Sequence, residues 1–504
     1  MTETTANTNQ IAATAPASGF SGADIPAYED YAHCVHCGLC LNQCPTYKLW
    51  GLEADSPRGR IRQIILVDQG RLPLGDSFVQ HIDQCLDCRA CESACPSGVQ
   101  YGKLVESARA QIEQNYRRPL FSRLTRDFVF RRLLPYPRRI AILARVLYLY
   151  QRSGLQSLAR ASGILGLLGL ADRERLLPPI DRKFFFSSLG RTYPAIGQRR
   201  ARVALFAGCV AQVSFSKLHE ATIRVLTANG CEVVVPAGQT CCGALAAHAG
   251  ARDAARGVAR TNLDVFLKDD FDAIITNAAG CGSTLKEYGH LFPAGTAEHS
   301  KASAFQKKMR DATEFLADLG MTAPLAELPL RVTYQDSCHL LHGQKIREAP
   351  RKLLRAIPGV ELVEMTMADY CCGSAGSYNV TDTETSLALL AEKMKHARAT
   401  GAPVIVTGKH TSAADACRSA NSFDRAGSGA RRGIAGSGAG QKSLVRIFRA
   451  APNLSGVISH QSNTGTRVAP CARNARPRRE CRSVLRRRRC GLPRRASASF
   501  HHRG

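Results

Sequence analysis

Eight cysteines in the first hundred residues fall into two copies of one spacing pattern. Each copy is Cys-x2-Cys-x2-Cys-x3-Cys-Pro, and the copies begin at Cys34 and at Cys85. Three thiolates of such a run wrap one small inorganic cluster, and a pair of runs is typical of proteins that hold two [4Fe–4S] clusters. The pattern therefore predicts a domain that handles electrons.

The spacing also predicts which cysteines share a cluster. In two-cluster proteins of this type, the last cysteine of each run ligates the other cluster. We expect one cluster to be bound by Cys34, Cys37, Cys40 and Cys95. We expect the second to be bound by Cys85, Cys88, Cys91 and Cys44. Zinc sites prefer paired Cys-x2-Cys units with a longer gap, and disulfides belong to oxidising compartments, so both alternatives are disfavoured.

The net charge of +27 is concentrated in one part of the 504-residue chain. The segment Arg418–Gly504 holds 19 arginines and one lysine against two acidic residues. The strong basicity is therefore a property of the tail, and it does not indicate a nucleic-acid-binding fold for the rest of the chain.

The beginning of the chain gives no sign of export. Residues 1–24 are mostly polar and small, and we expect a disordered lead-in there. We find no secretory signal and no apolar stretch long enough to span a membrane. These features predict a cytoplasmic protein, in which thiols stay reduced and available for cluster assembly.

A second cysteine repeat lies downstream. Its first copy comprises Cys209, Cys241, Cys242, Gly243 and Cys281, and its second copy comprises Cys338, Cys371, Cys372 and Gly373. The first cysteine and the Cys-Cys pair are 32 residues apart in the first copy and 33 in the second. Matching cysteines of the two copies are offset by 129 or 130 positions. Self-similarity of this kind indicates a duplicated structural unit.

Apolar, β-branched segments precede these cysteines and alternate with helical segments. The expected strands are 201–206, 231–236, 271–276, 331–334, 361–365 and 403–407, and the main helices are 219–228, 243–267, 351–356 and 383–398. This alternation predicts parallel α/β units. The repeated cysteines then follow the C-terminal ends of strands, where such sheets bind ligands, so we expect a metal or redox site. The alternative is a set of buried structural cysteines, which we expect only for Cys231.

The second copy breaks where its last cysteine is due. The offset predicts a counterpart of Cys281 at position 411, where the chain has Thr411. The sequence that follows is rich in Arg, Gly, Ser and Ala, and it has two interpretations. It is either a basic arm for nucleic acid or anionic lipid or an out-of-frame translation of a G·C-rich gene, and the loss of the expected ligand favours the second.

Two further features carry open interpretations. The basic, apolar segment 117–182 could lie on a membrane surface, pack on a partner subunit, or form an ordinary helical connector. His339 and His342 follow Cys338 and either approach a cluster or merely pack.

These observations predict an α+β multidomain chain. A mainly helical two-cluster ferredoxin domain is followed by two repeated α/β Cys-Cys-Gly domains and a disordered or out-of-frame tail. The expected boundaries are 1–24 lead-in, 25–116 ferredoxin-type domain, 117–200 basic helical connector, 201–325 first Cys-Cys-Gly domain, 326–408 truncated second Cys-Cys-Gly domain, and 409–504 basic low-complexity tail.

The ordered combination of motifs resembles the iron–sulfur subunits of bacterial glycolate oxidase. The similar segments are Cys34-Val-His-Cys-Gly-Leu-Cys40, Cys44-Pro-Thr-Tyr47, Pro57-Arg-Gly-Arg-Ile61, Cys85-Leu-Asp-Cys-Arg-Ala-Cys91, Cys95-Pro-Ser-Gly98, Lys286-Glu-Tyr-Gly289 and Cys371-Cys-Gly-Ser-Ala-Gly376. The resemblance runs from about residue 31 to residue 408. Related subunits occur in lactate-utilisation systems, anaerobic glycerol-3-phosphate dehydrogenase and heterodisulfide reductases.

The resemblance implies an oxidoreductase complex. A partner subunit with bound FAD would oxidise glycolate to glyoxylate, and this chain would carry electrons toward the quinone pool, as a peripheral protein of the inner membrane. It also implies that Cys-Cys-Gly domains can hold a further iron–sulfur centre, with Cys209, Cys241, Cys242, Cys281, Cys338, Cys371 and Cys372 as its candidate ligands. We expect no catalytic residue of substrate oxidation in this chain and no nucleic-acid partner.

Two other functions compete with electron transfer. The Cys-Cys-Gly domains could themselves reduce thiols or disulfides, in which case a mutation at Cys241 or Cys371 would abolish activity while the ferredoxin clusters stay reducible. The basic tail could instead bind nucleic acid, in which case deletion of residues 418–504 would abolish that binding alone.

Overall fold

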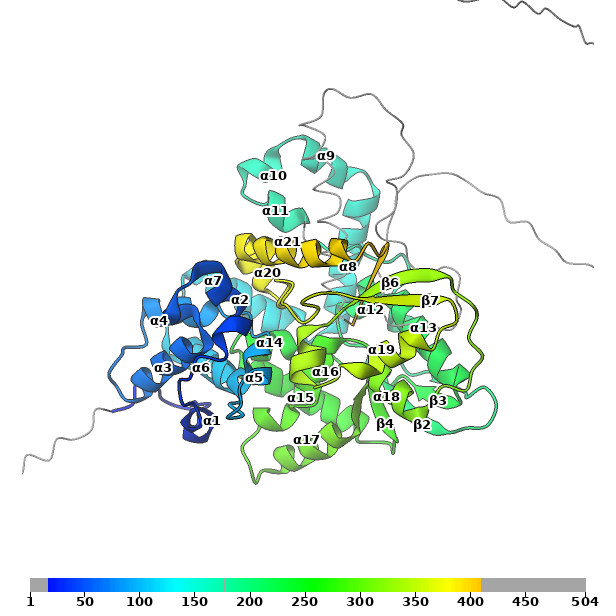
Figure 1. Ribbon diagram of the computed structural model, residues 1–504, viewed down its shortest axis with the longest axis horizontal. Helices are drawn as coiled ribbons and strands as arrows, with labels where there is room; N and C mark the ends of the chain where they lie inside the picture. The colour runs from blue at the N-terminus through cyan, green and yellow to red at the C-terminus, as the bar shows by residue number, and fades with distance from the viewer. Residues whose placement is uncertain (1–16, 176, 409–504) are drawn as a thin grey trace, which may run out of the picture. The chain divides into compact units, whose positions relative to one another are not determined.

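The computed structural model describes residues 17–175 and 177–408 (Figure 1). The first part of this region is helical, and the second part contains two sheets. None of the helices in these residues is both long enough and apolar enough to cross a lipid bilayer.

The N-terminal domain is built from short helices around the two cysteine runs. Its helices are α1 (Tyr28–Ala32), α2 (Pro45–Trp50), α3 (Pro57–Asp68), α4 (Asp76–Asp83), α5 (Ala90–Ser93) and α6 (Tyr101–Asn115). A proline opens both α2 and α3, where its missing N–H removes no helical hydrogen bond. The apolar faces of α3, α4 and α6 form the core, which includes the fully buried Ile64, Ile82 and Leu104.

The described end of the expected lead-in is packed rather than disordered. Phe20 is buried in the core of the N-terminal domain, and the Gly19 N–H donates to the Val67 carbonyl at 2.9 Å. The prediction of a disordered lead-in over residues 1–24 is therefore wrong for residues 17–24. One buried aromatic side chain and a few backbone hydrogen bonds suffice to fix such a segment. The amino-acid composition of the segment does not predict contacts of this kind.

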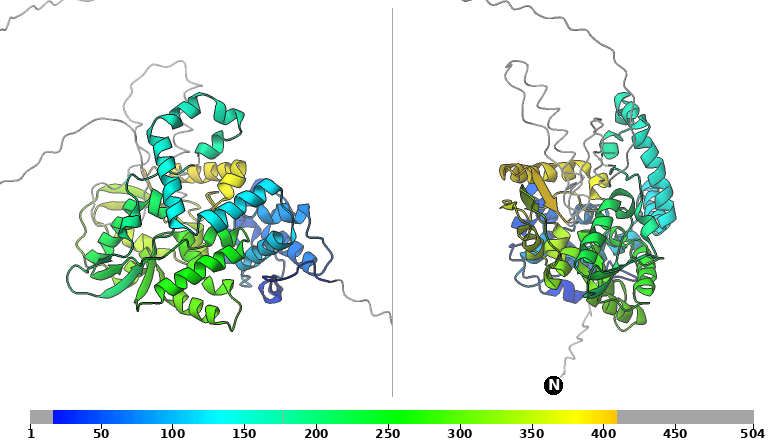
Figure 2. Two further views of the ribbon diagram at one scale, coloured as in Figure 1. Left: turned by 180° about the vertical axis from the view of Figure 1, so that it is seen from behind. Right: turned by 90° about the vertical axis from the view of Figure 1, so that its right-hand side faces the viewer.

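The connector is helical, as expected, and one of its faces belongs to the core of the next domain. It comprises α7 (Leu120–Asp127), the π-helical turn η3 (Phe128–Leu133), α8 (Pro137–Arg152), α9 (Leu155–Ala161), α10 (Ile164–Leu167) and α11 (Ala171–Arg175). Phe130, Leu134, Ile140 and Ala144 join the apolar core of the first Cys-Cys-Gly domain. Figure 2 shows the cyan helices of the connector, which include α8, beside the green elements of that domain.

The first sheet has the strand order β1-β3-β2-β4-β5. Its strands are β1 (Thr192–Tyr193), β2 (Ala201–Leu205), β3 (Cys231–Val234), β4 (Ala273–Thr276) and β5 (Met309–Asp311). The last four run parallel to their neighbours, whereas β1 pairs antiparallel with β3. Strand β1 lies within residues 117–200, so the end of the expected connector contributes to this sheet.

The second sheet repeats the central order of the first. Its order is β7-β6-β8, with β6 (Leu330–Gln335), β7 (Val360–Glu364) and β8 (Val404–Thr407), and both pairings are parallel. In both sheets the first strand of the repeat lies between the second and the third. This agreement confirms the duplication predicted from the cysteine offsets.

Helices connect the strands of both repeats. In the first domain they are α12 (Ala211–Ser214), α13 (Ser216–Ala228), α14 (Ala244–His248), α15 (Arg252–Phe266), α16 (Ala279–Leu285), the turn η5 (Tyr288–Leu291), α17 (Ala297–Lys308) and α18 (Ala312–Leu319). In the second they are the turn η6 (His339–Gly343), α19 (Glu348–Arg355), α20 (Tyr378–Thr381) and α21 (Thr383–Ala399). The four main helices predicted from the sequence are present, and the 243–267 prediction covers both α14 and α15.

Candidate iron–sulfur sites

The first cysteine run and the end of the second run meet at one cavity. Cys34, Cys37, Cys40 and Cys95 all line this cavity. The side chains of Arg58 and Ile61 from α3 also line it, and so does Cys91. Cys37 is exposed, whereas the other three expected ligands are partly buried. The structure thus brings the last cysteine of one run to the first three of the other.

The two cysteine runs share an unusual backbone. Positive φ angles occur at His36 and Gly38 in the first run, and at the equivalent Asp87 and Arg89 in the second. This left-handed conformation is uncommon for residues other than glycine, and both loops adopt it at the same two positions. A Cβ atom at Gly38 would lie 2.6 Å from Nη1 of Arg58, so glycine also makes room for that side chain.

The second run forms a more enclosed site. Cys44, Cys85 and Cys91 are buried and Cys88 is partly buried. The Sγ atom of Cys85 accepts hydrogen bonds from the Asp87 backbone N–H at 3.4 Å and from the Tyr101 hydroxyl at 3.6 Å. Donors of this kind favour a sulfur atom that carries negative charge, as a cluster ligand does.

Two thiols of each site have raised pKa values. Burial raises the pKa of Cys40 to about 11, and burial together with the neighbouring Cys85 raises the pKa of Cys91 well above its usual range. A hydrogen bond with Cys371 lowers the pKa of Cys88, but burial and the neighbouring thiols of Cys338 and Cys91 together outweigh it and raise that pKa to about 11. Four such thiols become thiolates together only if a cation compensates their charge, so the donor sets fit iron.

A buried arginine lies beside the second site. The side chain of Arg60 is 1% exposed, and it donates to the His81 carbonyl at 2.6 Å and to the Thr46 hydroxyl at 3.1 Å. Its positive charge interacts with both Cys44 and Cys85. Positive charge near a cluster favours the reduced form of the cluster and so raises its reduction potential. Spacing arguments about cysteines did not identify Arg60 as a functional residue.

The first Cys-Cys-Gly domain gathers four thiols. Cys209 follows β2, Cys241 and Cys242 follow β3, and Cys281 lies in α16 after β4. The Sγ atoms of Cys241 and Cys209 are 3.5 Å apart, and those of Cys242 and Cys281 are 3.2 Å apart. Cys231 lies in strand β3 and is fully buried in a different core cluster, so the prediction that it is a core residue is confirmed.

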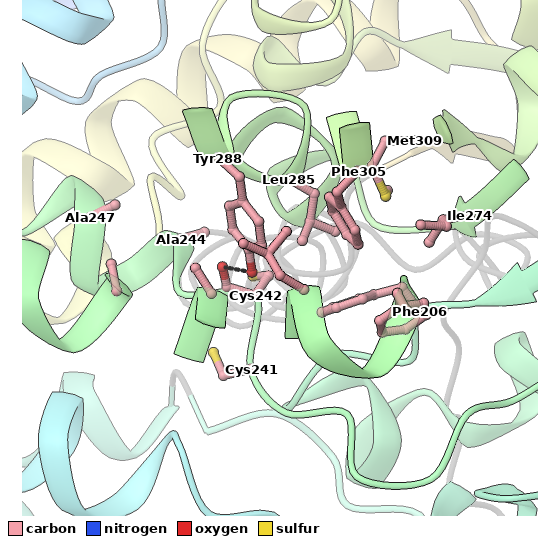
Figure 3. Close-up of a cluster of buried hydrophobic side chains, with 14 of the residues drawn as sticks. Phe206, Cys241, Cys242, Ala244, Ala247, Ile274, Leu285, Tyr288, Phe305 and Met309 are labelled. Carbon is pink, nitrogen blue, oxygen red and sulfur yellow. Dashed lines mark hydrogen bonds between the residues drawn. The ribbon is translucent and has the colours of Figure 1, made fainter. Parts of the chain in front are cut away.

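The Cys-Cys turn is held by the glycine after it and by an aromatic layer. Gly243 has a φ of +80°, and a Cβ atom there would lie 2.9 Å from Cγ2 of Val258. The hydroxyl of Tyr288 donates to the Cys242 carbonyl at 2.9 Å, and its ring stacks on Phe305 (Figure 3). These contacts fix both thiols against a rigid apolar core.

The second Cys-Cys-Gly domain turns its thiols toward the ferredoxin domain. Cys371 interacts with Cys338 and also with Cys88 of the second run. Cys338, Cys371, Leu86 and Tyr378 share one buried cluster, and Cys88 packs against it. The fourth position of this repeat, Thr411, lies outside the described residues. The proximity of Cys88 to Cys371 was not predicted, because nothing in either spacing pattern relates the two domains.

The two histidines after Cys338 reach the same cysteine run. Nε2 of His339 lies 2.9 Å from the Asp87 carbonyl oxygen, and Nδ1 of His342 lies 2.9 Å from the Ser93 hydroxyl. Of the two interpretations of these histidines, the structure thus favours packing: they hold the second repeat against the loop that carries Cys88.

Comparisons with known protein families match most of the described chain. Residues 30–99 match the 4Fe-4S dicluster domain, and residues 203–286 and 332–411 match the cysteine-rich domain. Residues 121–177 match the linker region of the glycolate oxidase iron–sulfur subunit. The chain therefore contains a domain for two [4Fe–4S] clusters followed by two cysteine-rich domains.

The alignments with individual relatives span most of the length of each relative. A probable glycolate oxidase iron–sulfur subunit of Bacillus subtilis is 42% identical over 380 residues, which span 74% of this chain and 86% of the relative. The glycolate oxidase iron–sulfur subunit of Escherichia coli is 32% identical over 381 residues, with the same coverage. Lactate utilization protein A of Oceanobacillus iheyensis is 32% identical over 208 residues, which span 41% of this chain and 84% of the relative.

Proposed function

This chain belongs to the family of glycolate oxidase iron–sulfur subunits, and we propose that it carries electrons from a flavoprotein partner toward a quinone-type acceptor. The partner would hold FAD and oxidise glycolate to glyoxylate. The two [4Fe–4S] clusters supply one-electron transfer when bound. The observation that carries the proposal is the gathering of eight cysteines from two distant runs into two sets.

The ligand assignment follows from these sets. Cys34, Cys37, Cys40 and Cys95 would hold one cluster, because they line one cavity. Cys85, Cys88, Cys91 and Cys44 would hold the other, because Cys91 interacts with Cys85 and Cys44, and Cys88 interacts with Cys91. The exchange of the fourth cysteine places the two sites next to each other, as transfer between them requires.

The surroundings of the two sites suit different roles. The first site carries the exposed Cys37 and the exposed side chains of Val35 and Leu39, so a redox partner can approach it closely. At the second site, Tyr101 donates a hydrogen bond to Cys85, and the positive charge of Arg60 acts on Cys44 and Cys85. These residues exclude water and stabilise added negative charge.

The first Cys-Cys-Gly domain would hold a further iron–sulfur centre. Its four thiols converge from three strand ends, and all four come from within the domain. In the second domain, Cys338, Cys371 and Cys372 would extend the path from the second cluster, since Cys371 interacts with Cys88. Both domains would then serve electron transfer rather than a separate thiol chemistry.

The connector would place the protein on the inner membrane as a peripheral subunit. Helix α8 exposes Ile142, Val146 and Leu149, which are 58–63% exposed and spaced along one face. Exposed arginines such as Arg145 and Arg152 flank this stripe. An apolar stripe with flanking cationic side chains suits the surface of a membrane with anionic lipids.

The decisive experiment follows the electrons in the purified complex. Glycolate, added anaerobically, should reduce the iron–sulfur centres when the flavoprotein partner is present, and a soluble quinone analogue should reoxidise them. The isolated chain should not respond to glycolate. Reduction of the isolated chain by glycolate, or no reduction in the complex, would contradict the proposal.

A second substrate class deserves the same assay, because the chain is also similar to lactate utilization protein A. Lactate or glycerol 3-phosphate would replace glycolate as the reductant in that case. Faster cluster reduction by either compound than by glycolate would favour a related dehydrogenase complex.

A further inference from the structure

A buried group of two carboxylates and two imidazoles lies where the ferredoxin domain contacts both Cys-Cys-Gly domains. Asp87 and Glu106 come from the ferredoxin domain, His248 ends helix α14 of the first repeat, and His339 follows Cys338 of the second. Asp87, His248 and His339 each offer a donor atom within 4.8 Å of the other two. None of these four side chains has a place in the ligand sets described above.

The distances within the group are short. Nδ1 of His248 lies 2.6 Å from Oε1 of Glu106 and 3.0 Å from Oδ2 of Asp87. The rings of His248 and His339 meet edge to face, with their centroids 5.0 Å apart. Two carboxylates and two imidazoles thus converge on one small volume.

The carboxylate of Asp87 has few partners for a buried group. Its side chain is 3% exposed, and the nearest donor, Nδ1 of His248 at 3.0 Å, lies closer still to the carboxylate of Glu106, at 2.6 Å. The nearest cation besides His248 is Nε of Arg89, which is 3.9 Å away. Two buried carboxylates that share one imidazole N–H require an explanation, and a bound cation provides one.

We propose that Asp87, Glu106, His248 and His339 bind one divalent cation of the zinc type. Imidazole nitrogens and carboxylate oxygens are ligands that Zn²⁺ accepts, and four of them satisfy its tetrahedral preference. Ligand atoms about 2.0–2.1 Å from such an ion lie roughly 3.3 Å from one another. The observed separations of 2.6 and 3.0 Å need only a small expansion to reach that value.

The surrounding contacts orient the imidazoles for this role. His339 uses Nε2 to contact the Asp87 carbonyl oxygen at 2.9 Å, so Nδ1 would be the nitrogen that binds the cation. A second contact of this kind is the usual way in which proteins fix a metal-binding histidine. Since its ligands come from three domains, the ion would hold the loop between Cys85 and Cys88 against both repeats.

The alternative occupant of the site is a proton. Burial alone lowers the pKa of His248, but the carboxylates of Asp87 and Glu106 outweigh it and raise that pKa to about 9. An imidazolium between two carboxylates would be a stable ion cluster without metal. The experiment must therefore separate a bound cation from a bound proton.

The test is metal analysis of the untagged full-length protein, purified anaerobically and desalted. Zinc, manganese, cobalt, nickel, copper, iron and acid-labile sulfide are measured together, per chain. We expect about one divalent metal ion beyond the iron that matches sulfide. The variants His248→Ala and Glu106→Gln should lose that ion and keep their iron and sulfide, whereas the control His299→Ala should keep all three.

Either result is decisive. Excess iron over sulfide that disappears in His248→Ala supports the site as well, since ferrous ion accepts the same ligands. No excess metal in the wild-type protein, or the same excess in wild type and in both site variants, would overturn the proposal and leave the proton as the occupant. If His248→Ala does not fold, Glu106→Gln and His339→Gln carry the test, because each retains a side chain of similar size.

Discussion

Arg89 of the second cysteine run and Glu287 of the first Cys-Cys-Gly domain form an ion pair of 2.5 Å across 198 residues of sequence. Arg89 is buried and has a φ of +61°. A Cβ atom at Gly102 would lie 2.3 Å from its Nε, so the start of α6 leaves a slot for the arginine. The pair ties the loop that carries Cys88 and Cys91 to the neighbouring domain.

Removing the acidic partner of this pair should loosen the domain contact. Glu287→Gln leaves the guanidinium of Arg89 buried without its closest counter-charge. Because Glu287 is 28% exposed, we expect a cost at the lower end for a buried pair, about 3 kcal/mol. We expect a lower urea midpoint for the variant and faster proteolysis between the two domains.

The matched control is Glu298→Gln. Glu298 and Arg260 form an exposed pair of 3.6 Å, whose side chains are 43% and 53% exposed. Its loss should change stability by less than about 1 kcal/mol. Equal effects of the two substitutions would mean that the Arg89–Glu287 pair does not hold the domains together.

The glycine of each Cys-Cys-Gly turn should be irreplaceable. Gly373 has a φ of +77°, and a Cβ atom there would lie 2.3 Å from the Ser386 carbonyl oxygen. Gly373→Ala therefore adds both backbone strain and a clash with backbone, and we expect a loss of about 2–3 kcal/mol. Gly257 in α15 has open space around it, so Gly257→Ala should be neutral or stabilise by up to about 1 kcal/mol. Urea unfolding of both variants checks this, and similar stabilities would contradict the turn geometry.

Cysteines of the first Cys-Cys-Gly domain should differ sharply in their effect on iron content. Cys241→Ala removes a thiol that lies 3.5 Å from Cys209, and it should lower iron and acid-labile sulfide below the wild-type values. Cys231→Ala removes a core thiol from the same domain, and it should leave both values unchanged. Unchanged iron and sulfide in Cys241→Ala would rule out a centre in this domain.

The exposed stripe of α8 should determine membrane binding. Val146→Asp combined with Leu149→Asp places two negative charges on the stripe, so binding to vesicles with anionic lipids should fall about tenfold or more. The control Leu387→Asp changes an exposed leucine of α21, outside the connector, and should bind like the wild type. Vesicle flotation measures both variants. Equal binding of the stripe variant and the wild type would indicate that the connector faces a protein partner instead.

Local patterns predicted the parts of the molecule that local chemistry determines. The strands and the cysteines at their ends follow from alternating apolar segments and from repeat offsets, and the strand orders of the two sheets agree with the predicted duplication. The spacing rule also placed Cys95 with the first run, where the structure has it.

Contacts between domains could not be predicted in this way. Asp87 and Arg89 lie within the second cysteine run, but its spacing rule concerns the cysteines alone, and His248 belongs to no motif. The roles of all three depend on which domain surfaces meet. The same holds for the approach of Cys88 to Cys371. A single sequence reports the preferences of each segment, whereas long-range packing decides which polar side chains become buried together.

The content of iron and acid-labile sulfide per chain tests the central claim most directly. Anaerobically purified protein should contain at least about eight iron and eight sulfide, as two [4Fe–4S] clusters require. About twelve of each would mean that the Cys-Cys-Gly domains hold a further centre. Zinc without sulfide would contradict the account of this chain as an electron carrier.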